Sequence, residues 1–404
     1  MVKRLLLLLS CMLSASACEA GRLDQQEPLE YLVGFHAAVS NGELIATIKL
    51  EQATHVAKSF DFAAPESRYV VLAHTGEVTH SEGRLKWSPD AHGGTLKYRY
   101  TVDEDRGSGF DARLSEKGLL ARLDDVFPRA TVRTEKGARS KSTLSMESDQ
   151  DWSFETPYGN LKEPIQVPNQ GRNFTRPMGW FLGGNLATRR EVILDRQIAV
   201  STLPGDGARQ MDMLTFLQWT FPQVVEVMPN FPERLLIAVG GDGMWRGALS
   251  APRSLYLQKD RPLVSANGTS TLLHELFHVG GLHSAAEGDD WIVEGLAEYY
   301  SLLTLKRSGG LSDVRFDTAL SKLEDWAKRD AGQLTSPSKG ADTAYAVLIF
   351  HLLDKELSGE GRQLDQVVQA LIESEEQISL ARLRDICDSL LGRRSLILEG
   401  LDRT

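Results

Sequence analysis

Two histidines with a glutamate between them are the residues of this sequence best suited to chemistry. They stand in the stretch HELFH, as His274, Glu275 and His278. Residues four positions apart on a helix lie one turn above each other, so both imidazoles would share one helix face. Imidazoles bind zinc, and a glutamate beside such a pair can act as general base on a water that the ion activates. The pattern therefore predicts Zn2+ as cofactor and hydrolysis as the reaction.

A catalytic zinc needs a third protein ligand and keeps one position open. Four candidates follow the motif, namely His283, Asp290, Glu294 and Glu298. His283 would suit the metzincin pattern, but it comes one residue too early and no methionine follows Met244. The metzincin interpretation is therefore rejected, and the acids remain.

The acids lie in DDWIVEGLAEYYS, which has the apolar spacing of a second amphipathic helix. Trp291, Leu296 and Tyr299 are expected to anchor this helix in the core. Glu294 and Glu298 are four residues apart and share a face, which suits one metal ligand and one partner for a ligand histidine. The alternative is that both acids belong to a solvent-exposed helix face.

HELFH followed by WIVEGLAEYYS resembles the gluzincins and, more specifically, the glycyl aminopeptidase family. Members of that family pair an N-terminal β-domain with a thermolysin-like catalytic domain and hydrolyse peptides. The resemblance implies that His274, His278 and Glu294 bind zinc and that Glu275 is the general base. It also implies that Glu298 orients His274.

The resemblance also implies a residue that stabilises the oxyanion formed during hydrolysis, because gluzincins often use a tyrosine or histidine for this purpose. Tyr345, in SKGADTAYAVLIFHLLDKE, is the best candidate, and an aromatic on a core helix is the competing interpretation. His351 and His283 are weaker candidates, for which core or surface roles are favoured.

The sequence departs from the family at two places. Ser250, in GALSAPRS, stands where relatives carry a glutamate that binds the free amine of a substrate. Val279 and Gly280 replace an aromatic-asparagine pair. Aminopeptidase specificity is therefore less well supported than hydrolysis of peptides or proteins in general. The competing hypothesis is an inactive zinc-binding relative that serves as an envelope binding or structural lipoprotein.

The N-terminus has the layout of an export signal. Basic residues precede an apolar run from Leu5 and then small residues, which predicts a signal peptide over residues 1–20. Ala15-Ser16-Ala17 fits cleavage by ordinary signal peptidase, whereas the same residues before Cys18 resemble a lipoprotein box. The protein is expected in the periplasm or cell envelope, and a lipid on Cys18 would attach it to a membrane.

Length and composition set the frame for these motifs. The chain has 404 residues, 42% of them hydrophobic and 25% charged, as expected for a globular protein of more than one domain. A net charge of -10 argues against nucleic acid as a partner. Cys387 is the one cysteine clearly in the mature body, so a disulfide framework is excluded. No feature of the sequence indicates an oligomeric state.

The predicted fold class is α+β. Short alternating segments between Tyr31 and Asp103 predict strands of a β-sandwich, Leu114–Val126 a short helix, and Thr134–Gln150 a loop. Glu191–Ser201 is predicted to be a strand, and the chain from Leu302 onward mainly helical. The expected domains are an N-terminal β-rich domain at 25–150, a thermolysin-like catalytic domain at 151–305 and a C-terminal helical domain at 306–404.

Overall fold

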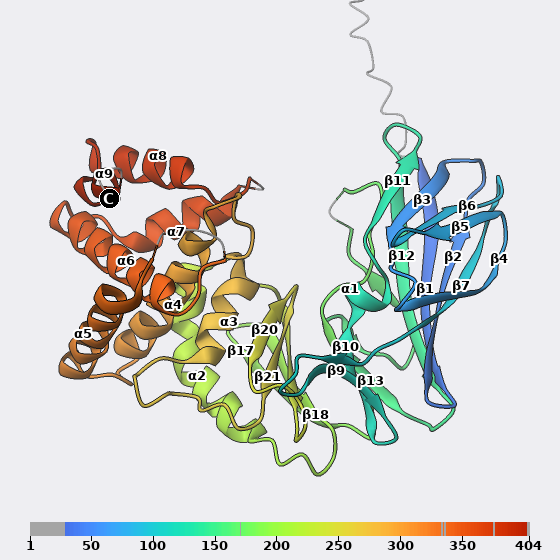
Figure 1. Ribbon diagram of the computed structural model, residues 1–404, viewed down its shortest axis with the longest axis horizontal. Helices are drawn as coiled ribbons and strands as arrows, with labels where there is room; N and C mark the ends of the chain where they lie inside the picture. The colour runs from blue at the N-terminus through green and yellow to red at the C-terminus, as the bar shows by residue number, and fades with distance from the viewer. Residues whose placement is uncertain (1–28, 170, 333, 335–336, 375, 402–404) are drawn as a thin grey trace, which may run out of the picture.

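The computed structural model describes residues 29–401 except 170, 333, 335–336 and 375. The predicted signal peptide and Cys18 lie outside the described residues. The fold is α+β, with sheets in the N-terminal half and helices in the C-terminal half (Figure 1). Among the described helices, none combines the length and the apolar character needed to cross a membrane.

Two sheets form the N-terminal part. The larger has the strand order β15-β12-β1-β2-β7-β4 and the smaller β11-β3-β6-β5. The larger contains β1 (Glu30–Ser40), β2 (Glu43–Glu51), β4 (Tyr69–His74), β7 (Gly93–Tyr100), β12 (Arg139–Ser148) and β15 (Ile165–Val167). The smaller contains β3 (Ala57–Ala63), β5 (Glu77–Ser81), β6 (Arg84–Ser88) and β11 (Ala130–Thr134). Both contribute to one apolar core, so the strands predicted between Tyr31 and Asp103 are confirmed.

The loop predicted at Thr134–Gln150 is wrong, because most of it is strand β12, which pairs in parallel with β1. Its inward positions include Ser140 and Ser142, both buried. The Ser142 hydroxyl donates to the Thr175 carbonyl, and the Ser140 hydroxyl accepts from the Thr175 N–H. Buried serines that are satisfied in this way leave no alternation of apolar residues in the sequence, which hid the strand.

A third sheet connects the N-terminal part to the rest, with the order β14-β13-β16-β10-β9-β8. It contains β8 (Glu104–Asp105), β9 (Phe110–Ser115), β10 (Gly118–Arg122), β13 (Ser153–Thr156), β14 (Gly159–Asn160) and β16 (Trp180–Gly184). The helix predicted at Leu114–Val126 is wrong except for α1 (Leu123–Val126). Gly118, with φ +154°, begins β10, so the chain turns back and pairs with β9.

The fourth sheet supports the candidate site and has the order β17-β18-β19-β21-β20. It contains β17 (Ala187–Ile193), β18 (Arg196–Thr202), β19 (Arg234–Gly240), β20 (Ala248–Ala251) and β21 (Ser254–Gln258). The strand predicted at Glu191–Ser201 is instead a hairpin of β17 and β18, in which Leu194 and Asp195 take positive φ. The helices α2 (Gln210–Val227) and α3 (Thr271–Gly280) pack against this sheet, and α4 (Asp290–Arg307) packs against both of these helices.

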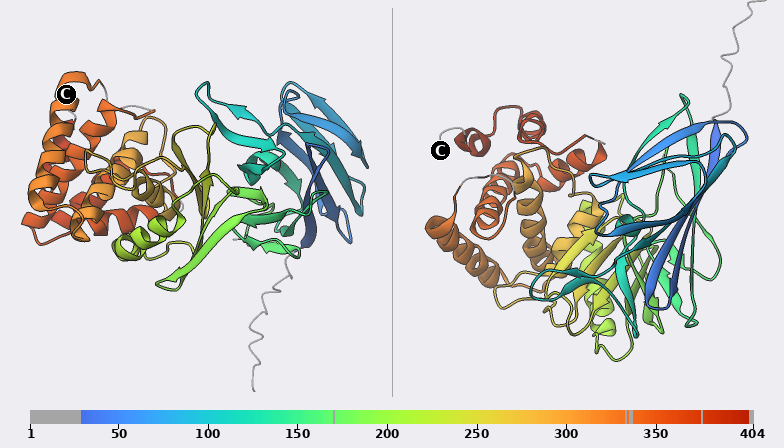
Figure 2. Two further views of the ribbon diagram at one scale, coloured as in Figure 1. Left: turned by 90° about the horizontal axis from the view of Figure 1, so that it is seen from below. Right: turned by 45° about the vertical axis from the view of Figure 1, so that its right-hand side comes forward.

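Helices complete the chain, as predicted. They are α5 (Asp313–Asp330), α6 (Ala341–Gly359), α7 (Leu364–Glu373), α8 (Leu380–Leu391) and α9 (Leu396–Gly400). Cys387 is buried in this region as a free thiol. Figure 2 shows the helices and the N-terminal sheets at opposite ends of the molecule, with the fourth sheet between them.

The apolar packing crosses both predicted domain boundaries. Phe154 and Phe181, beyond residue 150, belong to the N-terminal core. At the other boundary, residue 305 lies inside α4, and the helices on both sides of it share one core with the fourth sheet. The predicted division into domains therefore does not coincide with breaks in the hydrophobic core.

Candidate metal centre

The HELFH segment lies on α3, whose ends are set by its own sequence. Ser270 is the N-cap, and its hydroxyl accepts from the Leu273 N–H. Gly281 ends the helix with φ +144°, a conformation that favours glycine. The start and the end of α3 therefore follow from local features of the sequence. Buried leucine and phenylalanine side chains fix α3 in the core, while His274 and His278 face α4.

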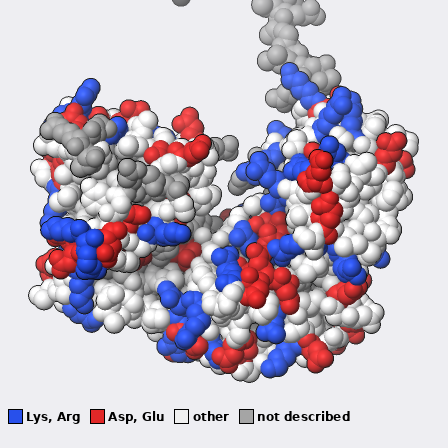
Figure 3. All heavy atoms as spheres, in the orientation of Figure 1, with Lys and Arg blue, Asp and Glu red and all other residues white. Residues whose placement is uncertain are grey.

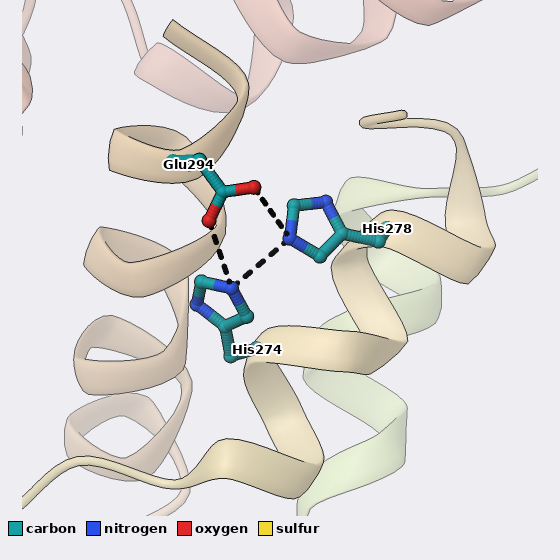
Figure 4. Close-up of side chains that lie close together, drawn as sticks. All are labelled: His274, His278 and Glu294. Carbon is teal, nitrogen blue, oxygen red and sulfur yellow. Dashed lines mark hydrogen bonds and ion pairs between the residues drawn. The ribbon is translucent and has the colours of Figure 1, made fainter. Parts of the chain in front are cut away.

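Close packing on α6 sets the direction of the acids on α4. A Cβ atom at Gly295 would lie 2.5 Å from the Cβ atom of Ala346, so only glycine allows α4 and α6 to approach this closely. Glu294 and Glu298 consequently face α3 rather than α6. Figure 4 shows Glu294 pointing from α4 toward both histidines.

His274, His278 and Glu294 form a compact triangle, which we call the ligand triangle (Figure 4). The two Nε2 atoms are 3.0 Å apart. The Glu294 carboxylate oxygens lie 3.4 Å from the His274 Nε2 and 3.5 Å from the His278 Nε2. A tetrahedral zinc with bonds of about 2.1 Å separates its ligand atoms by about 3.4 Å. The two nitrogen–oxygen distances match this spacing, and the two nitrogens are slightly closer.

The other nitrogen of each imidazole already has an acceptor. The His274 Nδ1 donates to the Glu298 carboxylate at 3.0 Å, and the His278 Nδ1 donates to the Leu282 carbonyl. In a neutral imidazole whose Nδ1 carries the proton, the Nε2 has a lone pair. When both rings carry their proton on Nδ1, the two lone pairs and the Glu294 carboxylate converge on one point, where a metal ion can bind. The donor set and its spacing therefore fit Zn2+.

The contacts among the three residues of the ligand triangle shift their pKa values. Burial disfavours charge on His274, but the hydrogen bonds to Glu294 and Glu298 outweigh this effect and raise its pKa to about 10. Burial and the charge of His274 lower the pKa of His278. Burial also acts on Glu294, but its hydrogen bond to His274 and the histidine charges prevail and lower its pKa. The site thus favours positive charge at its centre.

Glu275 lies on α3 beside the ligand triangle. Its side chain is buried, and no hydrogen bond or ion pair to its carboxylate occurs within the described part of the chain. Its negative charge favours the protonated forms of both His274 and His278, which places it close to each imidazole. A buried carboxylate without a protein partner beside the triangle has the position and the free acceptor capacity of a general base.

The remaining candidate ligands are not in the triangle. The His283 Nδ1 is 3.3 Å from the His278 carbonyl, and the Asp290 carboxylate accepts from the Ser338 N–H at 2.8 Å. Both residues line a separate cavity of about 600 Å³. The structure therefore brings Glu294, and neither of these two, to the histidines.

Tyr345 lies on α6 and lines a cavity of about 890 Å³ together with α5 residues and with His351. The adjacent Ala346 is the residue that contacts α4 at Gly295. Neither Tyr345 nor His351 belongs to the ligand triangle. The oxyanion role of Tyr345 stays a prediction. Burial lowers the pKa of His351.

Ser250 lies on β20, the outer strand of the fourth sheet, and α3 packs against this strand. The Gln258 N–H donates to the Gly247 carbonyl. In this antiparallel register, the backbone N–H and C=O groups of Leu249 therefore point toward β21. The backbone groups of Ser250 point away from β21, to the free edge. β20 is thus the last strand of the fourth sheet beside the metal helix, and it carries no acidic side chain.

Two contacts of the site were not predicted from the sequence. The carbonyl of Leu282 carries no sequence signal, because every residue has one. Ser301, on α4, hydrogen-bonds to the backbone of Ser270 at the start of α3. Ser301 follows Glu298 by three residues and therefore lies on the same face of α4, one turn further along. This position is a weak sequence signal for a contact with α3.

No family model matches the sequence, and no curated protein sequence matches it. Solved structures do match the fold. One is an aminopeptidase N family protein from Idiomarina loihiensis, with TM-score 0.65 and 14% identity over 90% of this chain and 71% of that one. Another is yeast LTA4 hydrolase in complex with bestatin, with TM-score 0.55 and 13% identity over 93% of this chain and 66% of that one. At these identities the likeness concerns the fold.

Proposed function

We propose that this protein is an exported zinc metallopeptidase that hydrolyses peptide bonds. The observation that carries the proposal is the ligand triangle, in which two imidazole nitrogens and a carboxylate from a second helix converge at the spacing of zinc ligands. The fold that the chain shares with an aminopeptidase N family protein and with a hydrolase supports the choice of reaction.

Each residue of the site has a distinct task in this proposal. His274, His278 and Glu294 would hold Zn2+, which supplies Lewis acidity toward a water and a peptide carbonyl. Glu275 would accept the proton of the attacking water and return it to the leaving amine. Glu298 would keep the His274 ring in the tautomer that leaves its Nε2 lone pair available.

The edge of β20 is the proposed substrate-binding surface. An extended peptide can pair with the free N–H and C=O groups of an edge strand, as in other cases of strand addition. Figure 3 shows the molecule hollowed between the helices and the N-terminal sheets, which leaves room for a chain. Because β20 has no carboxylate for a free amine, we expect N-acetylated peptides to be cleaved as well as free ones.

Export is part of the proposal and rests on the N-terminal sequence alone. The basic residues, the apolar run and the small residues before Cys18 support a periplasmic or envelope location, either soluble or lipid-anchored. An inactive zinc-binding relative remains the second candidate function, because Ser250 removes a substrate-binding acid of the resembled family.

The test combines metal analysis with peptide cleavage. Purified protein is expected to contain about one zinc per chain and to cleave a mixed peptide library presented with free and with acetylated N-termini. Glu275→Gln should retain zinc and lose activity by about 10²- to 10⁴-fold, the usual contribution of a general base. His278→Ala should lose both zinc and activity.

The outcomes separate the candidate functions. Stoichiometric zinc without any cleavage would favour the inactive relative. Protein that binds no zinc would contradict the proposal itself. Cleavage of free but not of acetylated peptides would retain the peptidase and show that a group other than Ser250 recognises the amine.

A further inference from the structure

The two helices that carry the ligand triangle are joined by a polar contact at the start of α3. The Ser301 hydroxyl on α4 accepts from the Ser270 N–H at 3.0 Å and donates to the Ser270 carbonyl at 3.1 Å. Both serines are fully buried. One side chain thus satisfies two backbone groups of the residue that caps the metal helix.

This contact belongs to a regular series across the two helices. On α3 the residues involved are four apart, and on α4 they occupy successive turns on one face. The contacts are Ser270 with Ser301, His274 with Glu298, and His278 with Glu294. The helices therefore run antiparallel with a fixed register, and the last two of the three contacts involve the histidines of the ligand triangle.

The serine contact is linked directly to a metal ligand through the backbone. The Ser270 carbonyl that accepts from Ser301 also accepts from the His274 N–H at 2.9 Å, which is the first hydrogen bond of α3. A displacement of α4 relative to Ser270 would therefore displace His274. Helical residues are spaced by about 1.5 Å, whereas metal–ligand distances tolerate about 0.2 Å, so a small slide would misplace the ligands.

We propose that Ser301 is a positioning residue of the metal site: its hydroxyl fixes α3 and α4 in the register that brings Glu294 to both histidines. The inference rests on the proposed function, since it assumes that the triangle binds zinc. Ser301 is two turns from Glu294 and does not contact the ion. Its effect passes through the Ser270 backbone and should be visible in metal affinity rather than in stability alone.

The test compares Ser301→Ala with a matched variant elsewhere. Ser254 is also fully buried, and its hydroxyl likewise accepts from a backbone N–H, that of Trp180 at 2.8 Å, and donates to a backbone carbonyl, that of Pro252 at 3.2 Å. It joins two strands away from the triangle. Zinc affinity of the full chain is measured by competition with a chromogenic chelator, and thermal stability is measured on the metal-free proteins.

Both variants are expected to unfold at lower temperature than the wild-type protein. Ser301→Ala should bind zinc about ten-fold more weakly or worse, as for other partners outside the first coordination sphere, whereas Ser254→Ala should bind it as the wild type does. Ser301→Thr keeps the hydroxyl and should restore most of the affinity. If the alanine variant does not fold, Ser301→Cys, a weaker hydrogen-bonding group of similar size, should still weaken zinc binding.

Two results would overturn the proposal in distinguishable ways. Equal zinc affinity of Ser301→Ala, or of its cysteine substitute, and the wild type would show that Ser301 contributes to stability only, while the proposed peptidase would stand. Failure of the wild-type protein to bind zinc would overturn the positioning role together with the proposed function.

Discussion

Two carboxylates illustrate the difference between a structural charge and a candidate ligand site in this protein. Glu155, on β13, is fully buried and pairs with Arg190 and with Arg234, the latter at 2.7 Å. Glu294, whose side chain is 29% exposed, pairs with the two histidines of the triangle, and the other nitrogen of each histidine faces a protein acceptor. The first carboxylate is balanced by two permanent cations, whereas the second faces imidazoles, which can give up their protons to a metal ion.

The comparison shows which buried polar clusters deserve a functional hypothesis. An arginine cannot lose its charge in a protein, so the Glu155 cluster is complete and joins β13 to strands β17 and β19 of the fourth sheet. Imidazoles, in contrast, can exchange their protons for a metal ion, so the Glu294 cluster can accept a ligand.

The largest expected effect concerns the balanced cluster. Glu155→Gln should lower the free energy of unfolding by about 3–5 kcal/mol, because it leaves the largely buried Arg234 without a charged partner. Chemical denaturation measures this loss. Zinc affinity of the folded variant should be unchanged. Glu324→Gln, which removes one partner of an exposed ion pair with Lys328, serves as control and should leave stability almost unchanged, because water and salt screen the pair.

A third carboxyl tests the opposite case, a half-buried acid whose side chain has no hydrogen bond or ion pair among the described residues. Burial and the neighbouring Asp124 raise the pKa of Asp125 to about 6. Because its folded-state pKa exceeds the unfolded value, its ionisation destabilises the fold as pH rises from about 4 to about 6. Asp125→Asn should therefore stabilise the protein by about 3 kcal/mol above pH 6 and have no effect below pH 4.

The adjacent residue is the matched control for this pH dependence. Burial raises the pKa of Asp124, but Arg122 and the Gly179 N–H outweigh this effect and lower it below its usual value. Asp124→Asn should therefore destabilise the protein at neutral pH, and the loss should disappear in acid. Denaturation curves at several pH values check both variants, and equal signs for the two would contradict this assignment.

A smaller effect is expected where the histidine partner is neutralised. Glu298→Gln keeps an oxygen that can accept from the His274 Nδ1 but removes the negative charge. Zinc affinity should fall by about ten-fold, with stability of the metal-free protein little changed. Chelator competition provides the measurement. A variant that binds zinc as tightly as the wild type would show that the Glu298 charge contributes nothing to the site.

The smallest effect is expected at Tyr345. Its position on the α5 side of α6 predicts that Tyr345→Phe leaves the kcat and KM for peptide cleavage unchanged. Steady-state kinetics provide the check. A large decrease in kcat with an unchanged KM would instead support the oxyanion role expected from the resemblance and would require the side chain to move toward the triangle.

The sequence predicted the elements whose signals are local. Helix α3 follows from its caps and its apolar spacing, and the shared face of His274 and His278 follows from helix geometry. The strands of the N-terminal sheet that alternate in hydrophobicity were predicted as well. Strand β12 was missed because its buried positions hold serines that are satisfied by distant residues.

The amino-acid sequence by itself determined that two imidazoles and a glutamate would lie together on one helix with a defined start and end. Only the tertiary structure decided that Glu294 completes the triangle, that Tyr345 faces α5, and that Ser301 holds the start of the metal helix. The physical reason is that spacing along a helix fixes which side chains share a face. The direction of that face and the register with its neighbour depend on packing between helices, such as the close approach at Gly295.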